Sequence, residues 1–107
     1  MKNFIQKGDN LEFAAPYAVT SGQGALVGAI FGVAALTLGS GERGVFAVSG
    51  VFELAKVSAQ AWSEGALIYW DNAARLCTTV SSGNTLIGVA SEVAANPTPV
   101  GRVRLRA

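Results

Sequence analysis

The chain has 107 residues, of which half are apolar and 14% are charged, and its formal net charge is +1. This length and composition predict a single compact domain over residues 1–107. The sequence contains no histidine, which excludes a Ser-His-Asp triad and removes the commonest metal ligand of proteins. Cys77 is the only cysteine, so it can form neither an internal disulfide nor a zinc site built from thiolates. We expect a buried, inert thiol in a protein assembled in a reducing cytosol.

The charges say what kind of partner to expect. Eight basic residues against seven acidic ones leave little positive charge for binding phosphates. Nucleic-acid binders usually show a basic excess or a concentrated basic face, so we expect no nucleic-acid partner. Lys7 and Asp9 interrupt the start of the chain before any long apolar run, and we therefore expect no secretory signal.

The first expected element is a short strand over residues 3–6. Phe4 and Ile5 are adjacent, so their side chains point to opposite faces of a strand and cannot both enter one core. Residues 8–10 have turn chemistry that separates this strand from the rest of the chain. We interpret residues 1–7 as an N-terminal arm that contacts another chain. The alternative is ordinary pairing within its own subunit.

An uncharged segment between Glu12 and Glu42 contains glycines at positions 24, 28 and 32, the spacing of a small-xxx-small membrane helix. Its apolar part has about 15 residues, fewer than the roughly 20 that a bilayer requires. No lysine or arginine anchors flank it, so we expect no membrane partner. The better prediction is two adjoining buried strands, with Gly28 and Gly32 at bulges or close backbone contacts.

The whole chain reads as short β-prone runs separated by turn residues about every 8 to 12 positions. This pattern predicts an all-β fold, a small sandwich or a partly closed barrel with at most one short helix. Residues 58–64 begin with a capping residue, end before Gly65 and are the best place for that helical turn. Residues 71–74 and 81–84 are expected turns. The expected strands cover residues 3–6, 11–14, 25–27, 30–36, 44–49, 51–57, 66–70, 76–79, 85–90 and 102–106.

The sequence lacks the common motifs of nucleotide-binding and catalytic sites. A dinucleotide fingerprint starting at Gly22 would need glycine where Val27 stands, and no Gly-Lys-Ser/Thr triplet for a P-loop occurs. Glu53 and Lys56 near Ser58 suggest a lysine-activated nucleophile, but solvent-facing strand residues are the simpler interpretation. Asp71 is expected to bond the backbone amides of its turn. We therefore predict no catalytic, cofactor-binding or metal-binding residue, and no cofactor.

Two groups of residues suggest contacts with other chains. Tyr69 and Trp70 point to opposite faces of one strand, and we expect one in the core and the other at an interface. In the last strand Arg102, Arg104 and Arg106 share one face, opposite Val103 and Leu105, so this strand should lie at an exposed position of its sheet. The arginines could contact phosphate or an acidic protein surface, or form a solvated face that prevents edge pairing.

Some strands are apolar on both faces. In the run from Val45 to Val48, Phe46 and Val48 alternate with Val45 and Ala47, all of them apolar. A single domain has only one core to fill, so the second face predicts a homo-oligomer.

Several weak motifs occur in a specific order along nearly the whole chain. They are residues 1–6 with Gly8 and Asp9, residues 24–34, residues 50–54 with Lys56, Trp62 and Gly65, residues 69–71, residues 83–84 with 86–89, and residues 103–105. This order is similar to that of the capsid cement, or head decoration, proteins of tailed phages and prophages. Such proteins have been mislabelled as RecA/RadA-type phage recombinases, whose core needs a P-loop and far more residues.

The resemblance implies a β-rich, non-enzymatic protein on the outside of a phage head, made in the bacterial cytoplasm. Its partners would be the major capsid protein and further copies of itself, most simply in a homotrimer. The alternatives are a phage accessory protein that binds nucleic acid or a membrane. The candidate contact residues for shell or subunit are Phe4, Ile5, Tyr69, Trp70, Arg102, Arg104 and Arg106.

Overall fold

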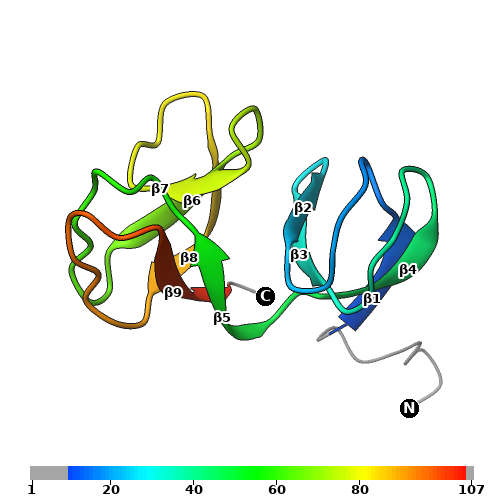
Figure 1. Ribbon diagram of the computed structural model, residues 1–107, viewed down its shortest axis with the longest axis horizontal. Coiled ribbons are helices and arrows are strands. Elements are labelled where there is room, and N and C mark those ends of the chain that lie inside the picture. The colour runs from blue at the N-terminus through cyan, green and yellow to red at the C-terminus, as the bar shows by residue number, and fades with distance from the viewer. Residues whose placement is uncertain (1–9, 106–107) are drawn as a thin grey trace, which may run out of the picture.

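The computed structural model describes residues 10–105 of the protein, and this part of the chain folds into nine strands in two antiparallel sheets, without a helix (Figure 1). The predicted all-β fold is therefore confirmed. The strands are β1 (Asn10–Ala14), β2 (Gly24–Val27), β3 (Ile30–Ala34), β4 (Arg43–Ala47), β5 (Gly50–Ala55), β6 (Leu67–Asp71), β7 (Leu76–Thr78), β8 (Thr85–Ala90) and β9 (Val100–Leu105).

The N-terminal sheet has the strand order β1-β4-β3-β2. The uncharged segment forms the hairpin of β2 and β3, as predicted, and not a helix. Val27 pairs with Ile30, so the connecting turn has two residues, and Gly28 adopts a φ of 59° that favours glycine there. Gly32 is a close contact: a Cβ at this position would lie 2.7 Å from the Cβ of Phe46. The expected close contact is therefore found at Gly32, whereas Gly28 lies in the turn and not at a bulge or a close contact.

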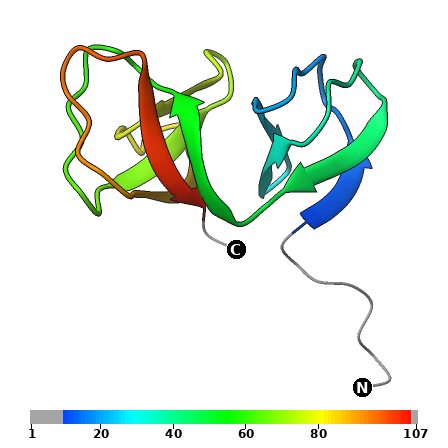
Figure 2. The same cartoon turned by 60° about the horizontal axis from the view of Figure 1, so that its bottom comes forward.

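The C-terminal sheet has the order β5-β9-β8-β6-β7 and curls into a half-barrel. β7, at one edge of this sheet, returns to the end of β5, at the other edge, where the Val57 amide donates to the Cys77 carbonyl at 3.0 Å. Figure 2 shows β5 and β9 side by side, and the chain passing from β4 into β5 between the two sheets. The last strand, β9, lies between β5 and β8, so it has one exposed face but is not an edge strand.

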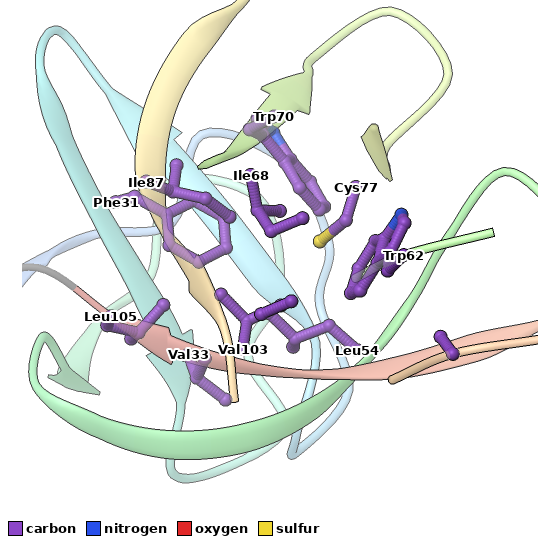
Figure 3. Packing of buried hydrophobic residues seen from close by; sticks show 12 residues of the cluster. Phe31, Val33, Leu54, Trp62, Ile68, Trp70, Cys77, Ile87, Val103 and Leu105 are labelled. Atoms are coloured by element: carbon purple, nitrogen blue, oxygen red, sulfur yellow. The ribbon is translucent and has the colours of Figure 1, made fainter. Parts of the chain in front are cut away.

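The main apolar core fills the inner side of the C-terminal sheet. Phe31 and Val33 of the N-terminal sheet point into the same cluster (Figure 3). The ring of Phe31 meets that of Trp70 with centroids 4.9 Å apart. A second, smaller cluster around Phe46 lies within the N-terminal part, where Phe13 stacks on Phe46 at 4.1 Å. Packing of β3 against the C-terminal sheet therefore connects the two halves.

The predicted helical turn at residues 58–64 is wrong. The segment is an irregular loop, because its groups find partners elsewhere in the chain. The Trp62 amide donates to the Ala94 carbonyl at 2.9 Å, and its own carbonyl accepts from the Ala94 amide at 3.0 Å. The Trp62 ring is buried in the main core. Tertiary pairing thus overrides a local preference worth only a fraction of a kcal/mol per residue.

The interpretation of Lys56 as a solvent-facing residue is also wrong, because its side chain is buried. Its ammonium donates hydrogen bonds to the carbonyls of Val57 and Gln60 and lies 5.6 Å from the centroid of the Trp62 ring. Burial lowers the pKa of this ammonium. Backbone carbonyls and an aromatic face therefore replace the water that a surface lysine would keep.

Cys77 lies fully buried in the core, and burial raises the pKa of its thiol to about 12. In an unfolded chain the thiol ionises near pH 8.5, so above that pH the unfolded state releases a proton that the folded state keeps. We therefore expect the thiol to lower the free energy of unfolding by about 2 kcal/mol when the pH is raised from 7 to 10. Urea titrations at both pH values measure this loss.

The matched control for this prediction is Cys77→Ala, which should lose about 2 kcal/mol less than the wild type over the same pH range. The lowered pKa of Lys56 acts in the opposite direction and the raised pKa of Tyr17 in the same direction. Both groups are present in both proteins, so the difference isolates the thiol. An equal loss in the two proteins would contradict the prediction.

Candidate docking surface

No group of three or more Cys, Asp or Glu residues that could hold a metal occurs within residues 10–105. No helix there is long and apolar enough to cross a membrane. Asp71 accepts hydrogen bonds from the amides of Ala73 and Ala74, both at 3.1 Å, which confirms its predicted turn role.

The outer face of the C-terminal sheet carries the side chains that the strand alternation turns away from the core. In β6, Ile68 and Trp70 are buried whereas Leu67 is 53% exposed. In β9, Val103 and Leu105 are buried, whereas Arg102 and Arg104 are exposed. The same alternation turns Val51 of β5 outward, where it is 54% exposed.

Four of these outward residues form one continuous row across the sheet. Val51 stands opposite Arg104, Arg104 opposite Val89, and Val89 opposite Leu67. Such directly opposed residues have Cβ atoms about 4.5 to 5.5 Å apart, so the row is a contiguous strip of surface. Arg104 is thus flanked by Val51 and Val89, and Leu67 continues the row beyond Val89.

A shallow hollow lies at one end of this row. It has a volume of about 310 Å³ and is lined by Leu67, Leu86, Gly88 and Val89. Tyr69 stands opposite Leu86 and is half-buried at the border of the hollow. The hollow combines apolar walls with a concave shape, and could receive an apolar side chain of another protein.

The two described arginines on this face differ in their partners. Arg102 makes an exposed ion pair with Glu92 at 3.0 Å, a kind of contact that contributes little to stability. Arg104 has no ion-pair partner within residues 10–105. It stands among Val51 and Val89, where a partner that removes water would strengthen any hydrogen bond to its guanidinium.

The structure brings Tyr69, Arg102 and Arg104 together on this outer face, whereas Trp70 lies in the core. Trp70, which the sequence analysis also named as a candidate contact residue, is only 3% exposed, and the interface role of Tyr69 stays a prediction. Phe4, Ile5 and Arg106 fall outside the described residues, as does the expected strand over residues 3–6.

The sequence reasoning missed the apolar members of the face: Val51, Leu67, Leu86 and Val89. The alternation in residues 67–70 contained the signal for Leu67, since an apolar residue in phase with Tyr69 must point away from Ile68 and Trp70. We refer to these four residues, with Tyr69, Arg102 and Arg104, as the outer face.

In a comparison with protein families, residues 5–105 fit the model of a phage cement protein family. This match covers almost the whole chain and agrees with the resemblance noted in the sequence. Comparison with curated proteins and with solved structures gave no match.

Proposed function

Because this chain belongs to the phage cement protein family, whose role is to stabilise the capsid, we propose that its outer face binds the exterior of an assembled phage head. The observation that carries the choice of surface is the cross-strand row of Val51, Arg104, Val89 and Leu67 beside an apolar hollow. The partner is the major capsid protein, and the site of action is the virion.

The composition of the outer face supports a protein partner. Interface centres are depleted in most charged residues but enriched in aromatic residues and arginine, and polar groups surround them. The outer face follows that arrangement, with Leu67 and Val89 at the hollow, Tyr69 beside it and Arg102 and Glu92 at the rim. Exposed apolar residues do not stabilise an isolated monomer. Contact with a partner protein therefore explains the apolar part of the outer face.

Cementing requires a preference for the assembled lattice. A partner that binds assembled shell better than free subunits shifts the equilibrium towards the shell by that difference in affinity. An oligomer multiplies the effect because each copy holds a different shell subunit. We propose a homotrimer for this reason, with residues 1–7, including Phe4 and Ile5, as an arm that contacts shell or neighbour. No catalytic step is part of this proposal.

The direct test mixes the purified protein with phage heads that lack it. We expect saturable co-sedimentation with heads, weaker binding to unassembled capsid protein, and a higher temperature of shell disruption for decorated heads. Cryo-electron microscopy should place the added density on the exterior, with the C-terminal sheet towards the shell. Equal affinity for unassembled capsid protein, or binding to DNA or lipid vesicles without binding to heads, would overturn the proposal.

A further inference from the structure

A second concave site lies between the two sheets, apart from the outer-face hollow. This cleft has a volume of about 140 Å³, which is room for one side chain of a partner. The N-terminal part contributes Tyr17 and residues 22–24, and the C-terminal sheet contributes residues 53–55 of β5 together with Trp70 and Arg75. Two features of its walls, a free strand edge and a fixed guanidinium, indicate what it would bind.

The first feature is the free edge of β5. This strand pairs with β9 on one side, and within residues 10–105 its other edge meets only the bridge from Lys56 to Cys77. The Lys56 amide donates to the Pro99 carbonyl, so the alternation of an antiparallel ladder turns the amides of Leu54 and Phe52 towards β9. The amides and carbonyls of Val51 and Glu53 consequently point away from β9, towards the free edge.

The second feature is the position of Arg75. Its backbone lies in the left-handed region with a φ of 58°, and its amide donates to the Asp71 carbonyl at 2.6 Å. Its guanidinium carbon lies 3.6 Å from the centroid of the Tyr17 ring. Tyr17 is itself held in place, because its hydroxyl donates to the Gly24 carbonyl at 2.9 Å. Strand, turn and ring together orient one guanidinium at the cleft.

This guanidinium has no carboxylate partner within the described residues. An arginine fixed on an aromatic ring with free N–H groups is suited to bind a carboxylate by donating two hydrogen bonds to it. Glu53 is an acidic residue of the cleft wall, but it makes no ion pair with Arg75 or with Arg102, which pairs with Glu92. Charge complementarity at the Arg75 end of the cleft therefore selects an acidic side chain.

We propose that an extended segment of the shell protein adds as a strand to the free edge of β5, with an Asp or Glu side chain in the cleft bound to Arg75. An added strand would use the unpaired amides and carbonyls of this edge. Its main-chain hydrogen bonds would supply affinity, and the side-chain pocket would supply specificity. This inference rests on the proposed function, because it names a second contact with the same shell.

Hydrogen exchange on decorated heads tests the strand addition. In the free protein the amides of Val51 and Glu53 should exchange quickly, and on heads they should exchange at least tenfold more slowly. Heads that bind the protein without protecting these amides would overturn this inference and leave the proposed function standing. Protection already present in concentrated free protein would assign the edge to a second copy and also overturn it. Absence of binding to heads would overturn both proposals.

Variants test the carboxylate contact in the same head-binding assay. Arg75→Gln should weaken binding about tenfold to a hundredfold, the range for a hydrogen bond to a charged group. Arg75→Lys should restore part of the loss because it keeps the charge. Arg43→Gln, which changes an exposed arginine paired with Glu12, is the matched control and should bind as the wild type does. Equal binding by Arg75→Gln and the wild type would overturn the assignment of Arg75.

A proline at position 53 tests the edge independently. Glu53→Pro removes an amide that faces away from β9, a position where strands tolerate proline, so the sheet should persist. Head binding should fall at least tenfold, whereas Glu53→Gln, which keeps the amide and removes a negative charge from the cleft wall, should bind heads no more weakly than the wild type. Wild-type binding by a folded Glu53→Pro variant would overturn strand addition, and exchange data on the wild type decide the matter if the variant does not fold.

Discussion

Replacing Trp62 by alanine should lower the free energy of unfolding by about 3 to 5 kcal/mol. Trp62 is the largest side chain that is fully buried in the described part of the chain, and it lies in the main core with Leu54 and Cys77 (Figure 3). Its removal leaves a cavity and also takes away the ring beneath the Lys56 ammonium. Since small domains have about 5 to 15 kcal/mol in total, this variant should be close to unfolding. Urea denaturation followed by circular dichroism measures the change.

Trp62→Phe is the control that separates packing from the polar group. The indole Nε1 is buried without a hydrogen-bond partner among residues 10–105, so phenylalanine removes an unpaired donor while it keeps most of the apolar contact. Relief of that donor should offset part of the lost volume, and the variant should lose less than about 2 kcal/mol. If the alanine and phenylalanine variants were equally unstable, packing of the ring would not be the source of the effect.

Introducing a carboxylate at Leu67 should weaken binding to phage heads at least thirtyfold, or about 2 kcal/mol. Leu67 lies at the meeting point of the cross-strand row and the apolar hollow. Binding would bury the new charge against apolar walls without a partner, which is strongly unfavourable. Because Leu67 is half exposed in the free protein, Leu67→Glu should change folding stability little. Quantitative co-sedimentation with heads measures the affinity.

Leu36→Glu is the matched control, since Leu36 is also an exposed leucine but lies outside the outer face, in the loop after β3. This variant should bind heads as the wild type does. Equal weakening by both substitutions would indicate a general effect of negative charge. Wild-type affinity in a folded Leu67→Glu variant would show that the shell contacts another surface.

The features that were predictable from the sequence are those with local causes. Alternation in residues 102–105 placed the arginines opposite Val103 and Leu105, as the burial of β9 confirms. Turn chemistry placed Asp71 correctly, and Gly32 lies at a close contact as expected. These patterns depend on neighbours two to four residues apart, so the amino-acid order alone is sufficient to reveal them.

The candidate site and the wrong predictions depend on residues far apart in the chain. The row of the outer face joins positions 51, 104, 89 and 67 only because β5, β9, β8 and β6 pair in that register. Lys56 is buried because carbonyls and the Trp62 ring surround its ammonium, and Trp62 is not helical because it pairs with Ala94. Sequence by itself therefore determined which way each strand faces. Only the tertiary structure decided which strands became neighbours, because register depends on packing between segments that no local pattern relates.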